Sequence, residues 1–113
     1  MLVMLGLKGI DFVRRRTSFG KLTGKFEGIS FKMVENATLL EAARWLCYQT
    51  LSSMDRGERC VKEIAMCKWW SVEIAWQIIH DVLLIHGHRG YSSQYPVEQR
   101  LRDMTGYEIA EAT

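Results

Sequence analysis

Proline is nearly absent from this sequence, which has a single one, at position 96, among 113 residues. A proline inside a helix removes a hydrogen bond and its ring clashes with the preceding turn. Long helices are therefore permitted almost everywhere before Pro96. No stretch has the alternating polar and apolar pattern that indicates a β-strand, and no segment repeats. The sequence thus predicts an all-α fold in one domain that covers 1–113.

A strong charge of one sign is also absent. Fifteen Lys and Arg stand against thirteen Asp and Glu, and the net charge of +2 is too small to indicate a nucleic-acid or membrane partner. The one basic cluster, 14–16, is short and suits the C-terminal end of a helix. The apolar opening 1–5 is followed at once by charged residues and is too short for a signal peptide or a membrane span. We therefore expect a cytoplasmic protein that binds neither nucleic acid nor membrane.

The cysteines are few, and their spacing does not indicate a metal site. They are Cys47, Cys60 and Cys67, an odd number without a CxxC pair, which predicts buried thiols in a reducing compartment. His80, His86 and His88 lie close together in the sequence and raise the possibility of a metal. A structural zinc site needs four ligands, and the cysteines lie elsewhere in the pattern. We interpret the three as surface or loop histidines and expect no metal.

Apolar residues recur every three or four positions in two long segments, which predicts two amphipathic helices. In Glu27–Asp55 they are Ile29, Met33, Ala37, Leu40, Ala43, Cys47, Leu51 and Met54, and in the second segment they are Val61, Ala65, Trp69, Val72, Trp76, Ile79 and Leu83. Gly57 suits the end of the first helix. The short connection makes the two helices antiparallel neighbours.

The remaining segments are interpreted from their glycines and the proline. Residues 2–16 have the composition of a helix, and 17–25 contain two glycines that interrupt it. Residues 86–95 predict a loop, and Pro96 predicts the start of a short helix. The expected architecture is an up-down antiparallel bundle of the four-helix type.

Chemistry at single residues adds little on its own. Gly87 and Gly90 follow the second long helix, where two glycines allow a backbone to approach a phosphate or simply form a turn. Glu111 alone indicates a solvated carboxylate, and we interpret Tyr91 and Tyr95 as anchors in the core or loop. No Ser/His/Asp or Cys/His arrangement follows from the spacing. Composition and periodicity predict a helical bundle and no activity.

Several segments together match a family pattern in order and spacing. They read Arg16-Thr17-Ser18-Phe19-Gly20-Lys21, FEGISFK at 26–32, Leu40-Glu41-Ala42-Ala43-Arg44, Asp55-Arg56-Gly57, Ala65-Met66-Cys67-Lys68, Gly87-His88-Arg89-Gly90-Tyr91, YPVEQR at 95–100, Arg102-Asp103 and Ile109-Ala110-Glu111-Ala112-Thr113. The pattern covers about nine-tenths of the chain without a gap. By this pattern the chain resembles the C-terminal helical-bundle domain of acyl-CoA dehydrogenases, whose last motif is usually IYEGT.

The resemblance implies an activity. Members of this family remove two hydrogens across the α and β carbons of an acyl-CoA thioester, and FAD accepts the hydride. Glu111 matches the glutamate that abstracts the α-proton in many members, and its backbone N–H helps to polarise the thioester carbonyl. A partly desolvated carboxylate within reach of the proton is suited to this role.

The resemblance also implies a set of FAD contacts. Arg16 matches the arginine that binds the FAD diphosphate of the neighbouring subunit, for which a planar permanent charge is suited. Ser18 matches a hydroxyl near the same group, and Phe19 an aromatic residue at the adenosine end. Gly87 begins the glycine motif that approaches the nucleotide, and Thr113 matches a threonine that touches it.

Three positions depart from the family pattern. Leu84 replaces a glutamine that contacts the flavin, while His88 and Ala112 each replace a glycine. These changes favour an alternative, a non-catalytic helical dimerisation or interaction module derived from the same domain.

The family also sets expectations for assembly. Members bind FAD between a β-domain and this bundle, in dimers or dimers of dimers, so we expect a homo-oligomer (dimer or tetramer). Relative to the family, the chain is truncated at both ends, as a gene fragment, a subunit of a split enzyme or an isolated domain would be. We expect it to be inactive alone, to bind FAD weakly alone, and to act on acyl-CoA only with the rest of the enzyme, possibly a separate chain.

Overall fold

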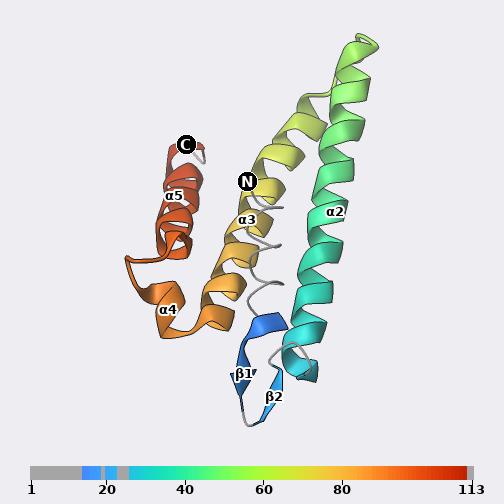
Figure 1. Ribbon diagram of the computed structural model, residues 1–113. Coiled ribbons are helices and arrows are strands. Elements are labelled where there is room, and N and C mark those ends of the chain that lie inside the picture. The colour runs from blue at the N-terminus through green and yellow to red at the C-terminus, as the bar shows by residue number, and fades with distance from the viewer. Residues whose placement is uncertain (1–13, 19, 23–25, 112–113) are drawn as a thin grey trace.

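Three long helices run side by side in the computed structural model of the chain (Figure 1). The structure describes residues 14–18, 20–22 and 26–111, and only the backbone of 17, 18, 21, 22 and 111. The helices are α2 (Glu27–Asp55), α3 (Val61–His86), α4 (His88–Tyr91) and α5 (Pro96–Glu111). Helix α3 lies between α2 and α5 and is antiparallel to both. The predicted all-α fold with antiparallel neighbouring helices is confirmed.

A short hairpin precedes α2. Strand β1 (Thr17–Ser18) pairs antiparallel with β2 (Lys21–Leu22), and Gly20 in the turn has a φ of 73°. A positive φ is open to glycine because it has no Cβ. The expectation of a simple break without strands is wrong here, since strands of two residues are too short to produce an alternating pattern. The hairpin lies at the end of the bundle where α2 begins and α3 ends (Figure 1).

The buried core lies between α3 and α5. Its members are Ala75, Ile79, Val82, Val97 and Met104, with Val72, Trp76, Leu83 and Leu101 packed against them. The predicted α3 stripe is therefore confirmed from Val72 to Leu83. It is wrong for Val61 and Trp69, which are 65% and 68% exposed. The reason is that α5 packs along only the later part of α3, within the part of the chain that is described.

The contact of α2 with α3 differs from the predicted stripe. The buried residues of α2 are Asn36, Ala43 and Thr50, whereas the predicted core residue Leu51 is 55% exposed. The hydroxyl of Thr50 donates a hydrogen bond to the Leu46 carbonyl at 2.9 Å, which satisfies this polar group. At Ala43 and Thr50 the small side chains allow the two helices to approach closely, and the internal hydrogen bond of Thr50 limits the polar cost there.

The thiols lie at or near this contact. Cys60 is buried and Cys47 and Cys67 are half-buried, and all three are free, as the sequence predicts. The Sγ of Cys47 lies 3.3 Å from the Ser71 hydroxyl, and the Sγ of Cys67 lies 3.1 Å from the Thr50 hydroxyl. Burial raises the pKa of the Cys67 thiol above its ordinary value, which keeps it protonated at neutral pH.

The ends of the helices follow the sequence in part. Gly57 has a φ of 76° just after α2, as predicted, and Pro96 begins α5. The helix that starts there is not short, because it continues through Gly106 to Glu111. None of the helices in the described ranges is long and apolar enough to cross a membrane.

Candidate functional site

Arg16 lies against the turn that ends α3. Gly87 in this turn has a φ of 65° and donates its N–H to the Leu84 carbonyl at 3.1 Å. A Cβ added at Gly87 would lie 3.7 Å from Nη1 of Arg16, so the guanidinium lies next to the open side of this glycine. The structure thus brings together two of the five predicted cofactor residues, one from before the hairpin and one from the end of α3.

The other predicted site residues are described only in part. Ser18 lies in β1, two residues after Arg16, and its backbone is therefore at the same end of the bundle. Phe19 and Thr113 lie outside the described residues. Glu111 is the last residue of α5, where only its backbone is described.

The segment 86–95 is more ordered than the predicted loop. It contains α4, and the buried Gly90 lets this helix pack on α3, since a Cβ there would lie 2.5 Å from the Leu83 carbonyl oxygen and 3.0 Å from the His86 Cβ. Gly87 and Gly90 therefore have different roles. Gly87 supplies the positive φ of the turn, and Gly90 supplies the close approach of α4.

Substituting two helical glycines, Gly90 in α4 and Gly106 in α5, tests the packing of α4. Gly90→Ala is expected to lower the free energy of unfolding by about 1–3 kcal/mol, because the methyl group meets backbone that must shift. A Cβ added at Gly106, within α5, would meet no atom within 4 Å. Gly106→Ala is therefore expected to raise the free energy of unfolding by about 0.5–1 kcal/mol. Urea unfolding followed by circular dichroism measures both. Equal effects of the two substitutions would contradict the close approach at Gly90.

The histidines do not form a metal site in the described part of the chain. His86 is buried, with 7% of its surface exposed, and its Nδ1 donates to the Val82 carbonyl at 2.8 Å. His80 stacks on Trp76 with ring centroids 4.9 Å apart. The interpretation as surface or loop histidines is therefore wrong for His86, whose ring is held by the preceding helical turn. No group of three His, Cys, Asp or Glu side chains suited to a metal occurs among the described residues.

Two of the three positions that depart from the family pattern lie on the surface next to Gly87, and the third, Ala112, lies outside the described residues. Leu84 is 60% exposed and His88 is exposed. Tyr91 is 79% exposed on α4 and Tyr95 is 41% exposed, so neither is an anchor in the core. Helical spacing from α3 could have indicated the outward position of Leu84, but the orientation of α4 depends on the packing of Gly90, which the sequence alone does not reveal.

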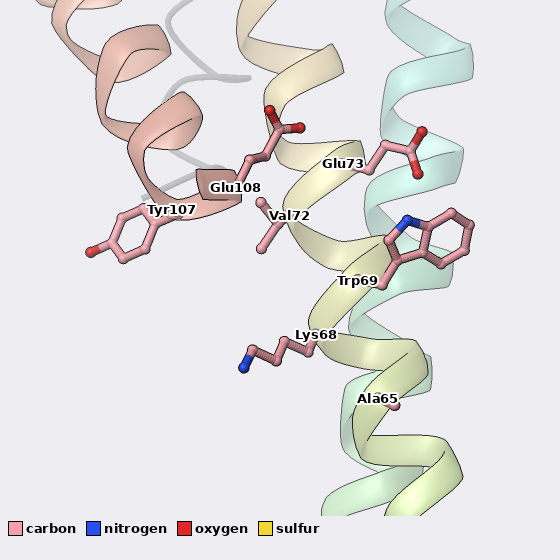
Figure 2. Close-up of a pocket in the computed structure, with 7 residues that line it drawn as sticks. All are labelled: Ala65, Lys68, Trp69, Val72, Glu73, Tyr107 and Glu108. Atoms are coloured by element: carbon pink, nitrogen blue, oxygen red, sulfur yellow. The ribbon is translucent and has the colours of Figure 1, made fainter. Parts of the chain in front are cut away.

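A pocket of about 510 Å³ lies between α3 and α5, within the usual size range of small-molecule sites. It is lined by Ala65, Lys68, Trp69, Val72 and Glu73 of α3 and by Tyr107 and Glu108 of α5. Figure 2 shows Lys68 and Tyr107 on one side of the α3 ribbon, and Trp69 and Glu73 on the other. Of the predicted site residues whose side chains are described, Arg16 and Gly87 do not line this pocket. Glu111 follows Glu108, which lines it, by about one helical turn.

Glu111 lies at the end of α5 that is far from Arg16 (Figure 1). Helix α5 begins beside α4, near the Gly87 turn, and runs away from it (Figure 1). Its 16 residues span about 24 Å at the standard rise per residue. A single copy of the described chain therefore does not bring the predicted base and the predicted diphosphate ligand together.

Comparison with known proteins shows which proteins the chain resembles. A protein-family profile described as "Acyl-CoA dehydrogenase, C-terminal domain" matches residues 8–113. An acyl-CoA dehydrogenase of Bacillus subtilis is 38% identical over 104 residues, which are 92% of this chain and 27% of that protein. The caffeyl-CoA reductase-Etf complex subunit CarC of Acetobacterium woodii is 37% identical over 106 residues, 94% of this chain and 28% of that protein.

A solved structure shows the same fold. The FAD complex of PigA superposes with a TM-score of 0.91 at 25% identity, over 96% of this chain and 28% of that chain. The chain thus spans only 27–28% of the length of the two curated relatives. Similar proteins therefore include acyl-CoA dehydrogenases, a subunit named for an Etf complex and a protein that holds FAD.

Proposed function

Because the chain belongs to the acyl-CoA dehydrogenase family, as its C-terminal domain, we propose that it supplies part of the FAD and substrate sites of an acyl-CoA dehydrogenase. The enzyme would oxidise the CH–CH bond next to the thioester carbonyl of an acyl-CoA. One observation carries the proposal: Nη1 of Arg16 lies 3.7 Å from the position that a Cβ would have at Gly87. A permanent cation therefore lies beside a backbone segment without a side chain, an arrangement suited to a diphosphate.

The residues at this turn fit the diphosphate end of FAD. Arg16 is exposed at the surface, and its planar guanidinium presents several donors to phosphate oxygens. Gly87 has no side chain to keep a nucleotide away from its backbone. Leu84, by contrast, offers an apolar surface where the family places an amide, so one hydrogen bond to the flavin would be lost.

Glu111 is proposed as the base that takes the α-proton from the substrate. When bound, FAD supplies a hydride acceptor for the β-hydrogen. Glu111 and Arg16 are separated by most of the length of α5, so we assign them to two different FAD molecules. Arg16 would then bind the diphosphate of the neighbouring subunit, which requires a homo-oligomer of at least two copies.

The partners of the whole enzyme follow from its relatives. CarC is named as part of a complex with Etf, which supports an electron-transferring flavoprotein as a partner of the enzyme that carries this domain. Free thiols at Cys47, Cys60 and Cys67 support a cytoplasmic location. The rest of the enzyme would cover the FAD that this domain only partly surrounds, so the chain alone is proposed to be inactive.

A non-catalytic interaction module is the second candidate. It is favoured by the exposed Leu84 and His88, which place an apolar side chain and a ring on either side of the Gly87 turn. The two candidates differ in whether the enzyme that carries this domain retains FAD.

Replacing Arg16 tests the proposed function. In the enzyme that carries this domain, Arg16→Ala is expected to raise the Kd for FAD about 10- to 100-fold, since a charged hydrogen bond to the diphosphate is lost. Flavin fluorescence during titration of the apoenzyme measures the Kd. Arg14→Ala is the matched control, because Arg14 is also exposed and lies outside the family motif. If both variants hold FAD as tightly as the unsubstituted enzyme, Arg16 is not a diphosphate ligand.

A further inference from the structure

An ion pair joins the beginning of α2 to α3 near its end. Nζ of Lys32 lies 3.6 Å from Oδ2 of Asp81. Asp81 is buried, with 8% of its surface exposed, while the Lys32 side chain is half-buried. A carboxylate at this depth is costly unless a cation compensates its charge. The cation comes from Lys32, the last residue of the FEGISFK segment, which the proposed function does not use.

A second buried polar side chain lies at the same level of the two helices. Asn36 is 7% exposed and follows Lys32 on α2 by about one helical turn. The contact of the Thr50 hydroxyl with Sγ of Cys67 sets the register of the antiparallel pair. Asn36 lies fourteen residues before Thr50, and Asp81 lies fourteen residues after Cys67. Equal steps in opposite directions therefore place Asn36 and Asp81 at one level of the contact.

Both of these side chains have an acceptor that lacks a donor. Oδ1 of Asn36 and Oδ2 of Asp81 are buried and make no hydrogen bond. The Lys32 ammonium lies just beyond hydrogen-bond distance of the Asp81 oxygen, but its charge acts strongly where water is largely excluded. Contact between α2 and α3 at this level is therefore held by the charge of Lys32 and would be costly without it.

The first turns of α2 offer few apolar contacts that could replace this link. Phe31 and Val34 are exposed, and the buried residues of α2 are Asn36, Ala43 and Thr50, of which Asn36 is the first along the chain. Among the described residues, the buried core cluster lies between α3 and α5 and includes no residue of α2. The position of these turns on α3 therefore depends strongly on a polar contact.

We propose that Lys32 is a positioning residue for the FAD diphosphate and acts through Arg16. The hairpin that follows Arg16 precedes α2, and it lies at the end of the bundle where α2 begins and α3 ends (Figure 1). On α3, Asp81 lies six residues before Gly87. If the first turns of α2 moved away from Asp81, Arg16 would move relative to Gly87. The proposal rests on the proposed function, because it concerns the same diphosphate contact.

Two substitutions in combination test whether Lys32 acts through Arg16. In the enzyme that carries this domain, Lys32→Met is expected to raise the Kd for FAD about tenfold, because the diphosphate contact is no longer preorganised. Lys32→Arg keeps the charge and should bind FAD within about threefold of the unsubstituted enzyme. In an Arg16→Ala background, Lys32→Met should raise the Kd by less than about threefold, since the contact that it positions is already lost. Flavin fluorescence during titration of the apoenzyme measures each Kd.

A pair without charges separates positioning from a loss of stability. Lys32→Met leaves Asp81 buried without its cation, so it should also lower the urea concentration at which the enzyme unfolds. Lys32→Met/Asp81→Asn removes both charges and should recover most of that stability. Its Kd for FAD should stay raised about tenfold, because the link between the helices is still missing. Lys62→Met, at an exposed lysine early in α3, is the matched control and should change neither property.

Amide hydrogen exchange of the 113-residue chain tests the link without FAD. Lys32→Met should speed exchange in residues 30–40 by about threefold or more, and should change it less in 44–55. Unchanged exchange in 30–40 would overturn the proposal, as would additive effects of the Lys32 and Arg16 substitutions, or a Kd that recovers together with stability. If Arg16→Ala weakens FAD binding and Lys32→Met does not, only this proposal is wrong. If Arg16→Ala itself has no effect, the proposed function fails and the positioning role with it.

Discussion

Replacing Glu111 by glutamine is expected to slow α-proton abstraction by about 10²–10⁴-fold, the usual contribution of a positioned general base. The amide keeps the shape of the side chain and loses the proton acceptor, so acyl-CoA should bind with little change. Reduction of the flavin after rapid mixing with acyl-CoA measures the step, in the enzyme that carries this domain. The dissociation constant for the substrate, from the same traces, measures binding.

Glu108 provides a matched control for this experiment. It is a carboxylate on the same helix, lies about one turn before Glu111 and lines the pocket between α3 and α5. Glu108→Gln is expected to leave flavin reduction within a few-fold of the unsubstituted enzyme, as surface substitutions usually do. If Glu108→Gln causes the large loss and Glu111→Gln does not, the base is in the pocket. If neither does, it lies on another part of the enzyme.

The sequence predicts the helices of the fold better than the faces that they bury. The periods of α2 and α3 and the turn at Gly57 suffice for two antiparallel helices. Helix α2, however, has apolar residues on two sides, since Leu40 and Met33 follow one stripe and Phe31 and Trp45 another. A helix with apolar residues nearly all round does not indicate which side is buried. Only packing against α3 shows that Asn36 and Thr50 are among the buried positions.

The ends of the structure depend on tertiary contacts. The sequence predicts a short helix after Pro96, because Gly106 has a low helix propensity and is expected to end it. The structure extends α5 to Glu111, since Val97, Leu101 and Met104 pack on α3 and outweigh a cost of about 1 kcal/mol at the glycine. The burial of His86 also depends on the structure. Its ring can be buried at the end of α3 because Nδ1 donates a hydrogen bond to the Val82 carbonyl.

The candidate site needed both the resemblance and the structure. Spacing alone gives no reason to connect Arg16 with Gly87, which lie far apart in the sequence. The family pattern assigns both to FAD, and the structure adds that they meet at one end of the bundle. The structure also separates Glu111 from them by the length of α5, which the motif order does not reveal. This separation leads to a second prediction with a large effect.

Two variants of the enzyme that carries this domain, each with little activity at limiting FAD, are expected to restore activity when they form mixed oligomers. One carries Arg16→Ala and the other Glu111→Gln. If the FAD of each subunit uses its own Glu111 and the Arg16 of its neighbour, a mixed dimer contains one site with both residues intact. With equal amounts, half of the dimers are mixed, so about a quarter of the unsubstituted activity should return. Turnover of acyl-CoA at limiting FAD, after joint refolding of the two variants, measures the recovery.

A double variant supplies the control that separates two arrangements. Arg16→Ala/Glu111→Gln, mixed equally with the unsubstituted enzyme, should leave about a quarter of the activity, because every mixed dimer then has a defect at both sites. If both residues act at the FAD of their own subunit, each mixed dimer keeps one intact site. About half of the activity would then remain, and the two single variants would restore nothing. That pair of results would assign Arg16 and Glu111 to one FAD molecule and would require a close approach of the two residues that the length of α5 opposes.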